Sequence, residues 1–255
     1  MIFISFCRLL LLISRMFRKV YDSLLTVVYP QVCQICENSV ENYSDGTVCR
    51  DCWETTRIFT GNEILCARCG AYLIESKTPI ETFCHRCDEH LYDAARAVGT
   101  YENALAASII HLKSEPFVSG NLQKLFVSAF YNSTFQNADL IIPVPLSKKR
   151  LLERGFNQAA ILAKILGKET KIKVDANSLV RNIHTPMHRA AMDRKAREAT
   201  VKNAFEVSRA ELIKNKTILL VDDVFTSGAT VSNCAEALKK EGAGKVYVLT
   251  VARAC

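Results

Sequence analysis

The stretch Lys216–Thr230 (KTILLVDDVFTSGAT) constrains this chain most, because it joins a strand, two carboxylates and a polar loop within a few residues. Thr217–Val221 has strand character and leads directly into Asp222 and Asp223. A loop rich in Thr, Ser and Gly follows, and a helix is predicted to begin near Val231. Carboxylates at the carboxyl end of a strand accept hydrogen bonds from sugar hydroxyls, and free N–H groups at a helix N-terminus suit a phosphate. The stretch therefore predicts a site for a phosphorylated sugar.

This order of residues resembles the signature of type I phosphoribosyltransferases, which is a strand, two acids and a T-[TS]-G-x-T loop. These enzymes bind phosphoribosyl pyrophosphate (PRPP). The resemblance implies that Asp222 and Asp223 are catalytic residues, which hold the ribose 2′- and 3′-hydroxyls and stabilise positive charge on the ring. It also implies a loop for the 5′-phosphate, made of Val224, Phe225, Thr226, Ser227, Gly228, Ala229 and Thr230.

Cysteine spacing indicates a metal-binding module near the N-terminus. Eight of the eleven cysteines form four C-x-x-C pairs, a pattern typical of tetrahedral Zn²⁺ sites and not of disulfides. The predicted ligands of two closed, structural zinc sites are Cys33, Cys36, Cys49, Cys52, Cys66, Cys69, Cys84 and Cys87. Two successive four-cysteine ribbons are the simplest assignment, and a cross-braced pairing is the alternative. Paired thiols favour a reducing cytosol, so the expected localisation is cytoplasmic.

The N-terminal segment 1–29 is expected to lie outside the catalytic fold. Ile2–Ile13 is apolar but shorter than the roughly 20 residues of a membrane span, so no stable transmembrane insertion is expected. We interpret Met16 as a candidate start of translation, which would leave residues 1–15 untranslated. Apolar residues within Phe17–Val28 recur at helical spacing, and this amphipathic helix either caps the next module or contacts a membrane surface or partner.

Alternating strand and helix patterns predict an α/β fold after the cysteines end. Predicted strands are Ala97–Tyr101, Asp139–Val144 and Lys245–Val251, with helical patterns between them. Such alternation is typical of a twisted parallel sheet flanked by helices. We therefore expect three parts: residues 1–29, a double zinc ribbon over 30–91, and a phosphoribosyltransferase-like domain over 92–255.

Four basic residues follow the predicted strand Asp139–Val144 and form a candidate pyrophosphate site. They are Lys148, Lys149, Arg150 and Arg154. Positive charge at the carboxyl end of a parallel strand can receive pyrophosphate, and an exposed basic turn is the alternative. The formal net charge of +7 likewise favours anionic partners.

The same region carries a narrower resemblance. Pro143–Leu146 (PVPL) and then R-x3-R-G-F-N-Q-x3-L-A, from Arg150 to Ala163, are similar to the ComF family of competence-associated proteins. That family also has an N-terminal cysteine ribbon, and its last strand ends in Ala-Arg, here Ala252–Arg253. The chain departs from the family at Thr185–His188, where the usual glutamine of T-x-x-Q is absent.

The superfamily resemblance further implies a mobile loop that closes over the reacting centre and excludes water. The candidate loop spans 181–197, and an ordinary solvated helix is the alternative. Its predicted site residues are Arg181, Arg189, Arg194 and Arg197.

Two functions follow from these patterns. One is a phosphoribosyltransferase that transfers phosphoribosyl from Mg²⁺-bound PRPP to an unidentified acceptor. The other is a non-catalytic competence factor that binds single-stranded DNA, with PRPP as a regulator or a vestigial ligand. In both cases the expected partners are PRPP and other proteins of DNA uptake, with single-stranded DNA as a further partner.

Overall fold

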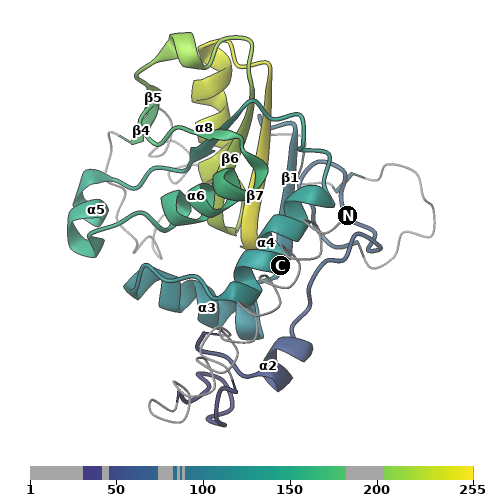
Figure 1. Cartoon of the computed structure of the whole chain (residues 1–255). Coiled ribbons are helices and arrows are strands. Elements are labelled where there is room, and N and C mark those ends of the chain that lie inside the picture. The colour runs from purple at the N-terminus through teal and green to yellow at the C-terminus, as the bar shows by residue number, and fades with distance from the viewer. Residues whose placement is uncertain are drawn as a thin grey trace, which may run out of the picture.

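The computed structural model describes residues 31–41, 46–73, 83–84, 87, 90–181 and 204–254. Its centre is a five-stranded sheet in the order β1-β7-β6-β2-β3 (Figure 1). The strands are β1 (Ala94–Thr100), β2 (Leu140–Pro143), β3 (Lys173–Val174), β6 (Thr217–Phe225) and β7 (Lys245–Arg253). All four pairings within it are parallel, so the predicted parallel α/β sheet is confirmed.

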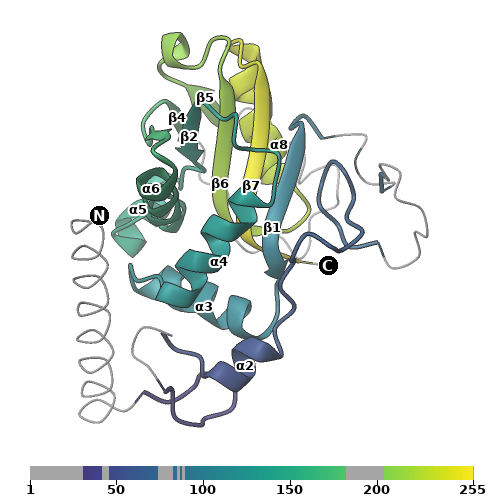
Figure 2. The ribbon, with the colours of Figure 1, turned by 45° about the vertical axis from the view of Figure 1, so that its right-hand side comes forward.

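Helices cover both faces of this sheet (Figure 2). They are α3 (Asn103–Ser114), α4 (Gly120–Tyr131) and α6 (Gln158–Thr170) on one face and α8 (Ala229–Lys240) on the other. Because side chains alternate along a strand, β6 contributes Leu219 and Val221 to the core under α3, α4 and α6, and Ile218 and Leu220 to the core under α8.

The strand that carries the two acids is longer than its sequence predicts. We expected the strand to end at Val221, but β6 continues to Phe225 because β7 pairs with it as far as Phe225↔Arg253. The pairing of β6 with β2, in contrast, ends at Val221↔Pro143. Asp222 and Asp223 therefore lie within β6, where one edge of the strand is free of β2. Helix α8 begins at Ala229, two residues before its predicted start.

Two local features on this side of the sheet position its helices. Gly167 lies within α6, which continues to Thr170 and ends where Lys171 adopts the left-handed conformation. A Cβ on Gly167 would clash with the Val174 side chain, so glycine allows α6 to pack closely on β3. The basic stretch is helical and forms α5 (Lys148–Arg154), which ends at the left-handed Gly155.

A small antiparallel pair, β4 (Leu179–Arg181) with β5 (Phe205–Val207), lies beside α8, at the upper left in Figure 1. We predicted Arg181 in a mobile loop, but it is the last residue of β4 and its guanidinium lies 5.2 Å from the Phe205 ring centre. The loop residues Arg189, Arg194 and Arg197 lie outside the described residues, as does the N-terminal segment 1–29.

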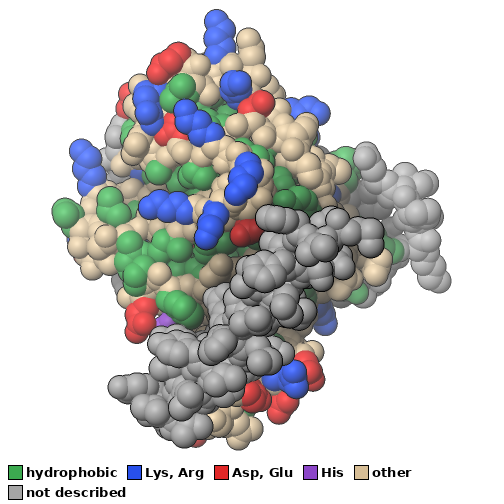
Figure 3. Space-filling model, viewed as in Figure 1, with side chains coloured by type: hydrophobic (Ala, Val, Ile, Leu, Met, Phe, Trp, Pro, Cys, Tyr) green, Lys and Arg blue, Asp and Glu red, His purple; other side chains and the backbone are tan. Residues whose placement is uncertain are grey.

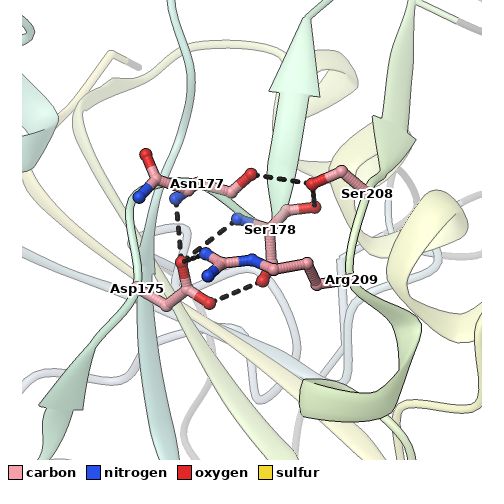
Figure 4. Close-up of polar contacts among 5 residues, drawn as sticks. All are labelled: Asp175, Asn177, Ser178, Ser208 and Arg209. Atoms are coloured by element: carbon pink, nitrogen blue, oxygen red, sulfur yellow. Dashed lines mark hydrogen bonds and ion pairs between the residues drawn. The ribbon is translucent and has the colours of Figure 1, made fainter.

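Polar contacts around Asp175 fix the base of this pair (Figure 4). Its buried carboxylate accepts hydrogen bonds from the backbone N–H groups of Asn177 and Ser178 and from the Ser178 hydroxyl. Arg209, just before the 3₁₀ turn η2 (Ala210–Leu212), forms an ion pair with the same carboxylate. Ser208 Oγ donates to the Asn177 carbonyl, which joins the start of β4 to the end of β5.

The cysteines gather in two groups that are successive in sequence. Cluster one contains Cys33, Cys36, Cys49 and Cys52, and cluster two contains Cys66, Cys69, Cys84 and Cys87. The successive assignment is therefore the one that the structure adopts. Cluster one includes the start of α2 (Arg50–Glu54), which lies near α3, whereas the chain of cluster two runs beside β1 (Figure 2). Among the described residues, no helix has the length and apolar character needed to cross a membrane.

Candidate functional site

The topology creates a crevice where the two acids lie. From β2 the chain passes through α6 to β3 on one side, and from β6 it passes through α8 to β7 on the other side. The carboxyl ends of β2 and β6 are therefore a topological switch point, the usual place for a ligand in an open parallel sheet. Asp222 and Asp223 lie at this point, one and two residues beyond the last β2–β6 pair.

Asp223 is the centre of a polar chain drawn from three elements. Its Oδ2 lies 3.3 Å from Lys113 Nζ at the end of α3 and accepts a hydrogen bond of 3.4 Å from Gln158 Nε2 at the start of α6. Gln158 Oε1 in turn accepts from Arg154 Nη1 at the end of α5. The Asp223 carboxylate is only 9% exposed and is held next to positive charge before any ligand arrives.

The R-G-F-N-Q segment (154–158) positions the side chains that form this set of polar contacts. Gly155 ends α5 with φ of 81°, a conformation that a glycine adopts without strain. Asn157 caps α6 by accepting from the Ala159 N–H and donates to the Val144 carbonyl at the end of β2. These turns bring Arg154 and Gln158 to the same side of Asp223.

Asp222 projects to the other face of β6, toward α8. Its Oδ1 accepts the Asp223 backbone N–H at 2.9 Å. Burial raises the pKa of Asp222 well above its ordinary value, and the charge of Asp223 raises it further. Burial also raises the pKa of Cys234 on α8, and the negative charge of Asp222 raises it further. The positive charge of Arg181 acts in the opposite direction and lowers the pKa of Cys234. Arg181 therefore lies on the Asp222 side of the sheet, although not in the predicted loop.

The predicted phosphate loop, Val224–Thr230, leads into an open helix N-terminus. Gly228 is the N-cap of α8 with φ of 80°, and as a glycine it has no side chain to cap the helix. Ser227 Oγ accepts the Ala229 N–H at 3.4 Å, and Thr226 and Ser227 are exposed. In contrast, Ser147 and Asn157 cap α5 and α6 with their own side chains. The first turn of α8 thus keeps backbone donors and a partial positive charge available to an anion.

The remaining predicted pyrophosphate ligands lie on α5 and do not reach the acids in this structure. Lys148 and Lys149 are exposed, and Lys149 Nζ lies 4.0 Å from Glu153 on its own helix. Arg150 contributes its N–H to the Ser147 cap of α5. Figure 3 shows Lys and Arg side chains spread over the face seen in Figure 1, with hydrophobic side chains exposed between them. Of the four predicted basic residues, only Arg154 is joined to Asp223, through Gln158.

The two cysteine clusters have the spacing of metal sites. A tetrahedral site with Zn–S bonds of about 2.3 Å places its sulfurs about 3.8 Å apart. The Sγ atoms lie 3.8 Å apart for Cys33 and Cys52 and 3.5 Å for Cys36 and Cys49 in cluster one. They lie 3.3 Å apart for Cys66 and Cys87 and 3.5 Å for Cys69 and Cys84 in cluster two.

Backbone donors support the thiolate form that a metal needs. Burial opposes ionisation of Cys33 and Cys66, but backbone N–H groups near their sulfurs lower the pKa of each thiol to about 6. One such donor is the Cys49 N–H to Cys33 Sγ, and its counterpart in cluster two is the Cys84 N–H to Cys66 Sγ. The repetition of this contact in both clusters indicates two structural zinc sites of the same kind.

Two parts of the chain match families of known proteins. Residues 24–88 match the family described as a double zinc ribbon domain, and residues 132–254 match the phosphoribosyl transferase domain. The DNA utilization protein YhgH of Shigella flexneri is 30% identical, over 90% of this chain and 99% of its own length. Competence protein F of Haemophilus influenzae is 27% identical, over 87% of this chain and 96% of its own length. Competence protein ComFC of Bacillus subtilis is 25% identical, over 82% of this chain and 85% of its own length. The chain belongs to the ComF family.

Two residues of this ComF-family site were missed by sequence reasoning. Gln158 belongs to the family motif, but the motif alone gave no reason for its contact with Asp223. Lys113 follows the apolar stripe of α3, and nothing in its local sequence distinguishes it from any surface lysine. Both contacts are long-range, 65 residues apart for Gln158 and Asp223, so only the tertiary structure brings them together.

Proposed function

We propose that this ComF-family protein binds PRPP in the crevice between β2 and β6. The observation that carries the proposal is the Lys113–Asp223–Gln158–Arg154 chain, which lies at the switch point of the sheet. The uncapped N-terminus of α8 follows the same strand. A carboxylate next to cations and an anion-binding helix end match the sugar hydroxyls and phosphates of PRPP.

In this proposal each group acts on one part of the ligand. Asp222 and Asp223 accept hydrogen bonds from the ribose 2′- and 3′-hydroxyls, and the loop Val224–Thr230 binds the 5′-phosphate. Arg154, with Lys148, Lys149 and Arg150 from α5, receives the pyrophosphate. Mg²⁺ would accompany PRPP and neutralise part of the pyrophosphate charge.

We propose that the chemistry is phosphoribosyl transfer to an acceptor that the site does not identify. The bond from ribose C1 to pyrophosphate breaks, pyrophosphate leaves with the electron pair, and the acceptor nucleophile forms the new bond to C1. Because the developing charge on the ring is positive, carboxylates next to it lower the barrier without an activated protein nucleophile. Arg189, Arg194 and Arg197 remain proposed residues of a closing segment, which follows Arg181, the last residue of β4, in the chain. The division at residues 30–91 and 92–255, with zinc structural in the first part, remains part of the same proposal.

Thermal shift measurements with fragments of PRPP test this assignment. A ligand that binds only the folded state stabilises it by RT ln(1 + [L]/Kd), so at equal concentration the tighter ligand gives the larger shift in Tm. Mg-PRPP should raise Tm more than ribose 5-phosphate or Mg-pyrophosphate at equal concentration, because it engages the loop, the acids and α5 together. Equal shifts for PRPP and pyrophosphate would argue against a sugar site. Release of pyrophosphate on addition of a candidate acceptor would then demonstrate turnover.

A second function, binding of single-stranded DNA without catalysis, is favoured by the surface of α5. Lys148 and Lys149 are exposed there together with Leu152, which is 85% exposed, and Leu151. Relatives are named for competence and DNA utilization, in agreement with a role in DNA uptake. Phosphate contacts make affinity fall steeply with salt. Lys148→Gln/Lys149→Gln should reduce the salt slope, and binding that is absent or independent of salt would eliminate this function.

A further inference from the structure

The phosphate loop touches a residue that follows cluster two in the chain. His90 lies close to Gly228, since a Cβ on Gly228 would be 3.0 Å from His90 Cε1 and 3.2 Å from Nε2. The same Cβ would lie 2.7 Å from the Phe225 ring, so the loop has no room for a side chain at this position. The His90 backbone N–H donates to the carbonyl of Cys87, a member of cluster two, at 3.3 Å. One residue thus connects a cysteine of the cluster with the N-cap of α8.

Aromatic stacking makes a second connection. The His90 ring stacks on Tyr92 with ring centres 5.0 Å apart, and Tyr92 meets Phe225 edge to face at 5.9 Å. Tyr92 is 1% exposed and shares one buried core with Cys66, Cys69, Cys87 and Phe225. Phe225 is the last residue of β6 and the start of the turn into α8.

Arg253 makes a third connection, from the end of β7. Its guanidinium lies 4.4 Å from the centre of the Phe225 ring, donates to the Cys69 carbonyl, and has Nη2 3.4 Å from Cys69 Sγ. A planar guanidinium can stack on an aromatic face and donate in its own plane at the same time. Arg253 therefore links the Phe225 ring, at the start of the loop, to the backbone of cluster two.

The helix after the loop is also attached. The Leu91 N–H donates to Oγ of the buried Ser232, in the first turns of α8, at 3.1 Å. His90 thus contacts the loop, and the next residue, Leu91, contacts α8.

Cluster one has no such relation to the loop among the described residues. Cys33, Cys49 and Cys52 belong to the other core, under α3 and α4. The chain that follows it contacts the start of α3, where the Ala104 N–H donates to Thr56 Oγ1 at 3.1 Å, and the second half of β1, where the Phe59 N–H donates to the Val98 carbonyl. Both contacts join residues outside the loop and outside α8.

We infer that cluster two, with His90, Tyr92 and Arg253 as positioning residues, holds the phosphate loop in its binding shape, and that cluster one does not. Zinc fixes the fold of a short cysteine ribbon that has little core of its own. Loss of metal from cluster two should therefore loosen Phe225–Ser232, while loss from cluster one should leave this segment unchanged. The inference deepens the proposed function, since the loop is the proposed 5′-phosphate site.

Hydrogen–deuterium exchange of the full chain, without any ligand, tests the inference. Cys84→Ala and Cys36→Ala each remove one ligand, from cluster two and cluster one respectively, and native mass spectrometry gives the zinc content. We expect amide exchange over 228–232 to accelerate about tenfold in Cys84→Ala and to change less than about twofold in Cys36→Ala. Equal exchange in the two variants would overturn the inference.

A second pair of variants keeps the test decisive if a cysteine variant does not fold. Arg253→Gln removes an arginine that contacts both cluster two and Phe225. Arg96→Gln is the matched control, since Arg96 on β1 donates to the Ala67 carbonyl of the same ribbon at 3.0 Å but belongs to no contact with the loop among those described. We expect faster exchange over 228–232 only in Arg253→Gln, with both zinc ions retained in both variants. Unchanged exchange in Arg253→Gln would reject the role of this residue. Because no PRPP is used, failure of the wild-type protein to bind PRPP would reject the proposed function alone.

Discussion

Two acids at the carboxyl ends of parallel strands have opposite environments in this molecule. Asp175 follows β3, and its buried carboxylate accepts hydrogen bonds from Asn177 and Ser178 and pairs with Arg209. Burial opposes ionisation of Asp175, but these contacts lower its pKa below the ordinary value. Asp222 lies in β6, where burial and the charge of Asp223 raise its pKa well above the ordinary value.

This difference separates a carboxylate that stabilises the fold from one that is kept for a ligand. The Asp175 carboxylate already accepts hydrogen bonds from several groups of the protein itself. Asp222 has one backbone donor, the Asp223 N–H, and a charged neighbour of the same sign. Groups held in an unfavourable state are concentrated at functional sites, since the ligand supplies the missing partners.

The largest effect on stability is expected for Asp175→Ala. The substitution leaves the Ser178 N–H and hydroxyl, the Asn177 N–H and Arg209 without their acceptor, in a buried place. We expect a loss of about 3 kcal/mol in the free energy of unfolding by urea denaturation. Asp139→Ala is the control, because exposed Asp139 accepts one backbone N–H, from Thr217, and its loss should be about 1 kcal/mol or less. Similar losses for the two variants would show that the Asp175 cluster has no special role.

Lys113, which lies next to Asp223, should affect PRPP affinity, whereas Arg209, which pairs with Asp175, should affect stability. Lys113→Met is expected to weaken Mg-PRPP binding about tenfold, because it removes the positive charge next to Asp223, with little change in stability. Arg209→Met should instead lower the free energy of unfolding by about 1 to 2 kcal/mol and leave PRPP affinity unchanged. Titration calorimetry and urea denaturation on both variants give the two quantities. If Lys113→Met destabilises the fold as Arg209→Met does and binds PRPP normally, Lys113 is structural.

The pH dependence of stability should have opposite signs for the two acids. A raised pKa in the folded state means that the folded protein binds more protons than the unfolded chain above pH about 4, so Asp222 lowers stability as pH rises. Asp222→Asn should therefore raise Tm by about 2 to 4 °C at pH 8, which corresponds to about 1 kcal/mol for a chain of this size, and by less at pH 4.

For Asp175, whose pKa is lowered, the stabilisation is present above its unfolded pKa and is lost as pH falls through the folded value. The difference in stability between wild type and Asp175→Ala should therefore shrink as pH falls below about 4. Scanning calorimetry from pH 3 to pH 8 measures both trends. A Tm gain for Asp222→Asn that is the same at every pH would contradict the raised pKa.

The sequence predicted those parts of the site that depend on local pattern. Asp222, Asp223 and the loop to Thr230 could be read because strand, acids and loop are consecutive, and the cysteine clusters because a C-x-x-C turn presents both sulfurs to one metal. The length of β6 could not be read, since it depends on pairing with β7 as far as Arg253. Strands of three residues such as β4 carry too little periodicity to be recognised, which is why Arg181 was placed in a loop.

Contacts between segments that are distant in the chain could not be predicted from the sequence either. Lys113 and Gln158 reach Asp223 only because α3 and α6 cover the same face of the sheet. No sequence feature predicts the place of His90 beside Gly228, which follows from the way cluster two packs on the end of β6. Such packing has no local signature.

Titration calorimetry of Mg-PRPP into wild type and Asp223→Asn tests the central claim most directly. The substitution keeps the shape of the side chain but removes the charge that faces Lys113 and Gln158. We predict saturable binding to one site in the wild-type protein and a loss of about 100-fold or more in affinity, equivalent to about 2.7 kcal/mol, in the variant. Asp139→Asn, which alters an exposed acid away from the crevice, should bind as wild type. Equal PRPP affinity in Asp223→Asn and wild type, or no binding by the wild type, would contradict the account.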